Sequence, residues 1–355
     1  MVPVTGNFQS ETALNSLAAQ ALFAALENGW ADPKKIGQAA SRAANLRNSA
    51  LESIAAKLGL KAEQIEISGE VGLGYLLSLG GFLAPHRKLF YGAGDRSGVI
   101  AAARSHHGDS QIVPLDHIGR LNFSKVEIGA NSILAYQLSN GETGAINTLP
   151  KNLPGDLLIA VDATAAGARL PLPSNWSSAV FDSRSWEGPS GLAIVAISDA
   201  ANWKNPLPHI SAVRRTYGTF SLPLLIASAV ALENFTPDDD RIRSFNKKVR
   251  EEILRAIPDV VVAGDLDSST PHLISFVFPN CNGEEILRGL SARGLAVDSG
   301  SACTAMNLQP SHVLAAMGLP TDGNIRITLH ANTDSKDLDL LISALVDEVQ
   351  SQRQR

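Results

Sequence analysis

The hydrophobic pattern of the chain begins with helices and then alternates between short apolar runs and helical segments. In residues 11–58 the apolar positions recur every three to four residues, and a break at residues 29–33 divides this stretch into two helices. Short apolar runs then predict strands at residues 64–67, 88–91, 111–114, 132–137, 157–162, 178–182 and 191–197, with helices at 72–81 and 98–105. This alternation is typical of a large, doubly wound, mostly parallel α/β sheet.

The last third of the chain has a different pattern. A helix predicted at residues 222–233 is followed by an acidic break at 236–240 that contains proline. Strands are then predicted at residues 260–263, 272–278, 296–298 and 324–329, among helices at 241–257, 283–293, 310–317 and 335–350. We therefore expect a large α/β domain over residues 1–235 and a small C-terminal α+β lobe over residues 236–355.

Composition narrows the class of protein. Of the 355 residues, 45% are hydrophobic and 18% are charged, which predicts a globular chain with a large core and excludes a disordered or fibrous one. The net charge of -5 argues against nucleic acid as the main partner, because phosphate binding needs a basic face. The uncharged run at residues 71–85 is shorter than the roughly twenty residues that cross a membrane. We expect a cytoplasmic protein without a membrane partner.

The two cysteines, Cys281 and Cys303, cannot make a disulfide framework and indicate a reducing compartment. Cys303 stands in Asp298-Ser-Gly-Ser-Ala-Cys-Thr304, between a predicted strand and a predicted helix. Small residues around one thiol predict an exposed loop, and a nearby helix N-terminus would lower the pKa of that thiol. A lone cysteine is more often a small buried residue, and we interpret Cys281 in that way. No third ligand stands near the adjacent pair at residues 106–107, so we expect no metal site.

Residues 298–319 closely resemble the cysteine loop and following helix of the cysteine desulfurases, pyridoxal-phosphate (PLP) enzymes of the class V aminotransferase family. In that family the loop cysteine takes sulfur from the substrate as a persulfide, and the resemblance implies this role for Cys303. It extends over nearly the whole chain, in order and with similar spacing. It implies the PLP-transferase type I fold, with a large doubly wound sheet domain and a small C-terminal lobe, and a homodimer.

Several positions match functional residues of the family. Asp162 and Thr164, in Val161-Asp-Ala-Thr164, match the segment whose aspartate pairs with the PLP pyridine nitrogen and keeps the ring an electron sink. Arg326 matches the arginine that grips the substrate carboxylate. Thr219 matches a threonine that reaches the PLP phosphate of the other subunit.

The lysine that forms the Schiff base with PLP is replaced. In the family a His-Lys pair stands before Gly-Pro-x-Gly, and here those two positions are Arg184 and Ser185. A serine hydroxyl cannot form an imine and is a poor base for the proton shifts that lysine performs. The register of this match is fixed by Gly188, Pro189 and Gly191.

Other cofactor positions also differ. The phosphate-binding turn of the family matches residues 67–72, where Gly69 is kept but Glu70 adds a negative charge. The histidine that stacks on the cofactor ring matches Arg96. The asparagine that contacts the cofactor matches Gly141, and Asn140 is a candidate substitute. The resemblance therefore implies PLP, whereas these residues predict that PLP is not bound covalently.

Three functions remain open on the sequence. The first is a desulfurase-like pseudoenzyme that relays sulfur through Cys303 to an acceptor protein, or that regulates an active desulfurase in a heterodimer. The second is a working PLP-dependent cysteine desulfurase or lyase with a non-standard site, favoured by Asp162 and Arg326 and opposed by Ser185 and Glu70. The third is a structural or ligand-sensing protein in which the cysteine loop has no role.

Overall fold

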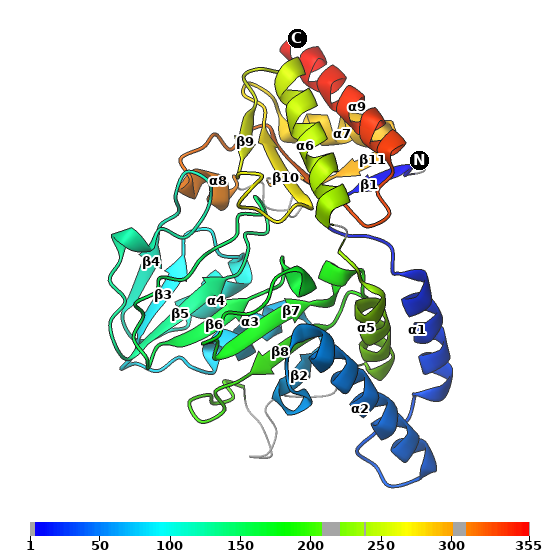
Figure 1. Ribbon diagram of the computed structural model, residues 1–355, viewed down its shortest axis with the longest axis vertical. Coiled ribbons are helices and arrows are strands. Elements are labelled where there is room, and N and C mark those ends of the chain that lie inside the picture. Colours follow the sequence, from blue (N-terminus) through cyan, green and yellow to red (C-terminus); the bar gives the residue numbers. More distant parts are fainter. Residues whose placement is uncertain (1–3, 208–220, 238, 301–309, 355) are drawn as a thin grey trace.

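The computed structural model describes residues 4–207, 221–237, 239–300 and 310–354, which form two lobes (Figure 1). The large lobe contains a seven-stranded sheet with the strand order β2-β8-β7-β6-β5-β3-β4. The strands are β2 (Ile65–Ser68), β3 (Lys88–Gly92), β4 (Ser110–Val113), β5 (Ser132–Gln137), β6 (Leu158–Asp162), β7 (Ser178–Asp182) and β8 (Ala193–Ile197). Strands β3 to β7 run parallel, and β8 is antiparallel to both of its neighbours. The mostly parallel α/β sheet confirms the predicted fold class.

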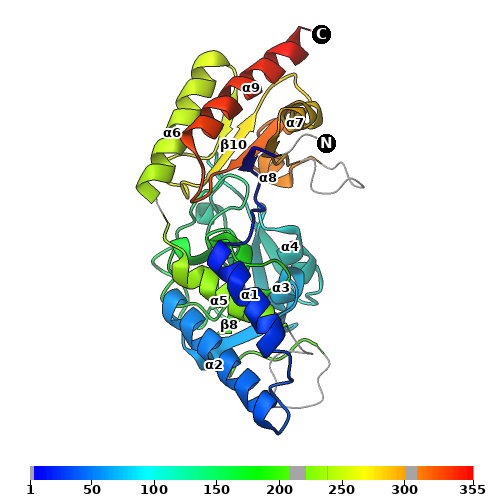
Figure 2. The same cartoon turned by 90° about the vertical axis from the view of Figure 1, so that its right-hand side faces the viewer.

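Helices cover both faces of this sheet (Figures 1 and 2). They are α1 (Ser16–Asn28), α2 (Gln38–Leu58) and α5 (Leu222–Asn234) on one face, and α3 (Val71–Gly80) and α4 (Ser97–Arg104) on the other. Phe90 and Leu134 pack toward the first group, whereas their strand neighbours Leu89 and Ile133 pack toward the second. Because both faces are buried, the strands are continuous apolar runs rather than alternating ones.

The small lobe is built around a three-stranded antiparallel sheet of order β12-β10-β9. Its elements are β9 (Val261–Ala263), β10 (Leu273–Val277), β11 (Leu295–Val297), β12 (Asn324–Thr328), α6 (Asp239–Ala256), α7 (Gly283–Ala292), α8 (His312–Ala316) and α9 (Ser335–Arg353). Short 3-10 helices complete the described chain: η1 (Ala62–Gln64), η2 (Phe123–Lys125), η3 (Gly167–Arg169) and η4 (Ser183–Trp186).

One strand of the small lobe comes from the start of the chain. Strand β1 (Gly6–Phe8) pairs in parallel with β11, and Phe8 lies in the core that α6, α7 and α9 share. The sequence-based division at residue 235 places these first residues with the large domain. From residue 4 the described chain thus runs in the small lobe, crosses to the large lobe before α1, and returns at the start of α6 (Figure 1).

Candidate functional site

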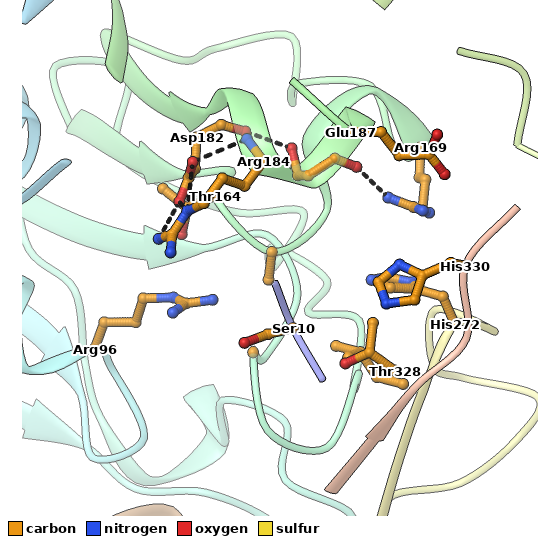
Figure 3. Close-up of a pocket in the computed structure, with 14 residues that line it drawn as sticks. Ser10, Arg96, Thr164, Arg169, Asp182, Arg184, Glu187, His272, Thr328 and His330 are labelled. Atoms are coloured by element: carbon orange, nitrogen blue, oxygen red, sulfur yellow. Dashed lines mark hydrogen bonds and ion pairs between the residues drawn. The ribbon is translucent and has the colours of Figure 1, made fainter. Parts of the chain in front are cut away.

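A pocket of about 110 Å³ lies between the two lobes, at the carboxyl ends of β6 and β7. In open α/β sheets this edge is where ligands bind. The large lobe lines it with Arg96, Thr164 and Arg184, and the small lobe lines it with His272 and His330 (Figure 3). Both lobes therefore contribute polar side chains to one cavity.

Asp162 ends β6 and is the first of a buried hydrogen-bonded series. The backbone N–H and the hydroxyl of Thr164 donate to Asp162 Oδ1 at 2.9 and 2.6 Å, and the Tyr75 hydroxyl lies 2.9 Å from Thr164 Oγ1. Burial, with Asp162 nearby, raises the pKa of Tyr75 above its usual range, so Tyr75 stays a donor. Asp162 Oδ2 is buried without a hydrogen-bond partner among the described atoms. This oxygen fits a ligand N–H such as that of a pyridinium ring.

Arg184 is held by two carboxylates at the adjacent strand end. Its Nη2 lies 2.6 Å from Asp182 Oδ2, its Nε lies 3.0 Å from the same oxygen, and its Nη1 lies 3.2 Å from Glu11 Oε1. The hydrogen bonds to Asp182 raise the pKa of Arg184. The guanidinium is therefore a fixed positive charge on the pocket wall.

Ser185 lines the pocket at the position of the expected lysine. It lies in η4, and its hydroxyl donates to the backbone carbonyl of Asp182 at 2.7 Å. The Ser185 carbonyl accepts from Arg169 Nη1 at 2.7 Å. The serine thus contributes to local structure, and its oxygen has no basic partner in these bonds that would activate it as a nucleophile.

The N-terminus of α3 is capped by a side chain of the protein itself. Glu70 accepts from the backbone N–H groups of Gly72 and Leu73, each at 2.7 Å and each through a different carboxylate oxygen. Gly69 precedes it, and both residues are exposed in the turn between β2 and α3. A helix N-terminus is a ready anion site. Here the anion is the Glu70 carboxylate, at the turn that matches the phosphate-binding turn of the PLP family.

Replacing Glu70 with alanine should lower the free energy of unfolding by about 1 kcal/mol, because two N–H groups of the first turn lose their acceptor. Urea unfolding of the variant and the wild type measures the difference. Glu52→Ala, on the exposed side of α2, is the matched control and should change stability by less than about 0.5 kcal/mol. Equal losses of unfolding free energy in the two variants would contradict the role of Glu70 as the cap of α3.

Arg96 and Gly141 are two departures from the family that form one contact. A Cβ atom on Gly141 would lie 2.4 Å from Arg96 Nη2, so the glycine leaves the room that the guanidinium fills. Asn140 beside it is buried and does not line the pocket. Its amide donates to Gly94 O and Gln137 Oε1, and its oxygen accepts from the turn at residues 142–143. The side chain of Asn140 therefore holds this turn.

Three lining residues have no local sequence signal: Arg169, His272 and His330. His272 is buried, and burial, followed by the charge of Arg169, holds its pKa well below the usual range. Burial also lowers the pKa of His330, whose Nε2 lies 2.8 Å from the Gln9 carbonyl. Both imidazoles are thus neutral at pH 7. Arg169 is the last residue of η3, His272 directly precedes β10, and His330 follows β12. Only the fold brings these three segments together (Figure 3).

No lysine reaches this pocket. Every lysine of the sequence belongs to the described residues, and none of them lines the cavity. Lys204, which follows β8, lies instead beside Gly81 and Arg87 in a separate surface cavity. A lysine from elsewhere in this chain therefore does not substitute for Ser185 within this structure.

The residues present could bind the ring nitrogen of PLP, but they do not suit its phosphate or its aldehyde carbon. The unpartnered Asp162 Oδ2 suits the pyridine nitrogen, although Asp162 lines a small interior cavity and not the open pocket. The helix end that would hold the phosphate carries Glu70, and the position that would hold the aldehyde carbon carries Ser185. The residues present do not fit covalently bound PLP.

The remaining predicted residues lie in three settings. Cys303 and Thr219 lie outside the described residues. Arg326, on β12, pairs with Asp298 through backbone hydrogen bonds of 3.0 and 2.8 Å; it does not line the pocket, whereas Thr328 does. Cys281 is buried in the small-lobe core.

The described part of the chain contains neither a membrane-spanning helix nor a cluster of metal-ligating side chains. Its helices include none with the length and apolar character needed to cross a bilayer. In the same ranges, no three His, Cys, Asp or Glu side chains gather in a way that could hold a metal ion.

The sequence matches the family model described as aminotransferase class-V over residues 97–341. It is 28% identical over 267 residues to a cysteine desulfurase of Sinorhizobium fredii, covering 68% of this chain and 67% of that protein. It is 27% identical over 249 residues to the cysteine desulfurase NifS of Azotobacter vinelandii, covering 65% of this chain and 62% of that protein. The match thus spans about two thirds of each relative.

Solved structures share the fold at lower identity. A NifS-like protein superposes with a TM-score of 0.85 at 19% identity, over 98% of this chain and 99% of that one. The cysteine desulfurase CsdA of Escherichia coli superposes with a TM-score of 0.75 at 15% identity, over 98% of this chain and 94% of that one. The two-lobed architecture is therefore that of NifS-like proteins.

Proposed function

Because the chain belongs to the class-V aminotransferase family and resembles its cysteine desulfurases, we propose that it is a pseudoenzyme that lacks covalent PLP chemistry and relays sulfur through Cys303. One observation carries the first half of this proposal. Ser185 occupies the lysine position, its hydroxyl is bonded to the Asp182 carbonyl, and no lysine of the chain lines the pocket. Glu70 supports it, since its carboxylate takes the N–H groups that a phosphate would need.

The second half rests on the cysteine loop at residues 298–304. In the proposed relay, the Cys303 thiolate attacks the outer sulfur of a persulfide on an active desulfurase. The S–S bond of the donor breaks, its cysteine leaves as a thiolate, and a new persulfide forms on Cys303. The exchange needs no external oxidant or reductant, because one persulfide is consumed for each one made.

If the chain has lost covalent PLP chemistry, its absorption spectrum in the presence of PLP should show no bound cofactor. Purified protein titrated with PLP should give the absorption of free PLP, and addition of L-cysteine should release no sulfide above the level without protein. After borohydride reduction of the mixture, peptide mass analysis should find no one lysine that is specifically modified by PLP. A saturable band that shifts with L-cysteine, together with released sulfide, would show that the protein is an enzyme and overturn this half of the proposal.

Sulfur relay predicts a dependence on one cysteine. An active desulfurase supplied with ³⁵S-labelled L-cysteine should label the wild-type chain, and Cys303→Ser should remove that label. Cys281→Ala is the matched control and should stay labelled, because Cys281 is buried in the small-lobe core. Equal labelling of Cys303→Ser and the wild type would refute the relay while leaving the spectral result unaffected.

A working PLP enzyme is the second candidate, and one observation favours it. Asp162 Oδ2 is buried without a partner, as expected of a residue kept for a ring nitrogen. Without lysine, such an enzyme would lose much of its general acid–base rate, typically about 10²- to 10⁴-fold. The PLP titration distinguishes the two candidates directly.

A further inference from the structure

The pocket between the lobes is positively charged, although the chain as a whole is acidic. Three arginines and two acids line it, namely Arg96, Arg169, Arg184, Asp182 and Glu187. The two lining imidazoles are neutral at pH 7, because burial holds their pKa values below the usual range. The lining side chains therefore carry one net positive charge, whereas the whole chain carries -5. A cavity of this charge attracts an anion.

Two of the arginines lie on the same side of the pocket. Figure 3 shows Arg96 and Arg184 on one side and His272 and His330 on the other. Hydrogen bonds to Asp182 raise the pKa of Arg184, and the charge of Arg96 opposes this rise. The two guanidiniums thus repel each other, and an anion bound beside both of them would offset the repulsion.

The place of Arg96 depends on Gly141. The guanidinium fills the space that a Cβ atom on residue 141 would take. The resemblance gives a ring-stacking histidine and a cofactor-contacting asparagine at these two positions, so the two departures together place a cation where the family has a cofactor ring. The turn at residues 67–72, which matches the phosphate-binding turn of the family, does not line this pocket. The positive charge is therefore in a different place from that turn.

The small lobe contributes a hydrogen-bonding atom without a partner. His272 is 6% exposed and lines the pocket, and its Nδ1 is buried with no hydrogen-bond partner among the described atoms. Leaving a buried polar atom unpaired costs free energy, and an oxygen bound in the pocket is a candidate partner for it. Ser10 and Thr328 add hydroxyl groups to the same lining.

The volume of the pocket and the directions of these groups favour a small tetrahedral anion. An apolar cavity of about 150 Å³ holds benzene, so a pocket of about 110 Å³ suits a slightly smaller ligand. A tetrahedral oxyanion presents acceptor oxygens in every direction, whereas a carboxylate presents them at one end. Because the polar groups of the pocket lie on opposite sides, the tetrahedral shape can use more of them at once (Figure 3).

We propose that the pocket binds a tetrahedral oxyanion of the size of sulfate or phosphate, held between Arg96 and Arg184 of the large lobe and His272 of the small lobe. The proposal names a ligand for the site that covalent PLP has left. It rests on the first half of the proposed function, the loss of covalent PLP, and not on the sulfur relay.

Isothermal titration calorimetry of the full chain tests the proposal. Sodium sulfate, potassium phosphate and sodium acetate are titrated separately at constant ionic strength, which keeps general screening equal. Sulfate or phosphate should bind saturably at one site, and acetate should bind more weakly by about 10-fold or more. No PLP is present, so a failure to bind oxyanions leaves the spectral test of the proposed function unaffected.

Variants of the two departures locate the binding. Arg96→Gln should weaken binding roughly 10- to 100-fold, because one charge-assisted contact is lost. Gly141→Ala should weaken it as well, since its Cβ would lie 2.4 Å from Arg96 Nη2 and move the guanidinium. The double variant should bind no more weakly than Arg96→Gln alone, because both changes act through one side chain. Arg104→Gln, at the exposed end of α4, is the matched control and should bind as the wild type does.

Thermal unfolding gives a second readout. Sulfate at a concentration well above its dissociation constant should raise the Tm of the wild type and of Arg104→Gln more than that of Arg96→Gln. The comparison between variants removes the general stabilisation that sulfate gives to proteins. Circular dichroism checks that each variant is folded. The absence of saturable binding, equal binding of acetate, or equal binding by Arg96→Gln and Arg104→Gln would overturn the proposal.

Discussion

Replacing Trp186 with alanine should lower the free energy of unfolding by about 3 to 5 kcal/mol. Trp186 is fully buried in the core between the sheet and α5, where its ring lies 6.5 Å from that of Phe181. Its indole N–H donates to the Ser228 carbonyl on α5 at 3.3 Å. Alanine would leave a cavity in the core and remove the hydrogen bond to the Ser228 carbonyl, and both effects destabilise the folded state.

Chemical unfolding followed by circular dichroism measures this loss. Trp186→Phe is the matched variant: it keeps most of the ring volume and gives up the indole N–H, so its loss should be clearly smaller. Trp186 also ends η4, which carries Ser185, so the alanine variant should loosen this wall of the pocket. A loss below about 1 kcal/mol for Trp186→Ala would mean that the indole is not the anchor of η4.

Replacing Asp95 with asparagine should change how stability depends on pH. Asp95 is buried beside α4, where its Oδ2 accepts from the Gly92 N–H at 2.7 Å. Burial raises the pKa of Asp95 from 3.8 to about 8, with a further contribution from Asp162. Between these two values the folded chain holds a proton that the unfolded chain does not. Wild-type stability therefore falls by about 1.4 kcal/mol per pH unit from this group as the pH rises through that window.

Asparagine removes this loss, because it carries no titrating proton. The stability of Asp95→Asn relative to the wild type should increase by about 3 to 4 kcal/mol between pH 5 and pH 8. Unfolding curves at several pH values measure the difference, in which the contributions of His272 and His330 cancel. Asp109→Asn, at an exposed position before β4, is the control and should give a constant difference. A constant difference for Asp95→Asn would refute the raised pKa.

The central sheet could be predicted from the sequence because each strand carries its own signal. The predicted ranges 132–137 and 178–182 coincide with β5 and β7, since strands buried on both faces are continuous apolar runs. Strand β1 was not predicted. Its three residues are too few for a period, and its partner β11 lies near the other end of the sequence. Pairing over that separation depends on the fold as a whole.

The site residues that could be predicted are those whose place in the sequence matches a motif of the family. Arg184 and Ser185 were assigned through the Gly-Pro-x-Gly register, and both line the pocket. His272 and His330 could not be found in this way, because their segments are distant in the sequence and meet through the pairing of β10 with β12, and only the packing of the small lobe against the large one brings them to the pocket. The charge of Glu70 was visible in the sequence, whereas its cap of α3 depends on the backbone geometry of one turn. The roles expected for Cys303 and Thr219 stay predictions.

The pairing of β1 with β11 has a consequence for synthesis on the ribosome. Gly6 is opposite Leu295, so β1 must wait for 289 further residues before its partner exists. At about 5 to 20 residues per second this interval lasts roughly 15 to 60 s. During that time the large lobe can form around its own sheet, while residues 4–8 have only solvent or other chains for partners. The small lobe can therefore close only after β11 has been made and has paired with β1.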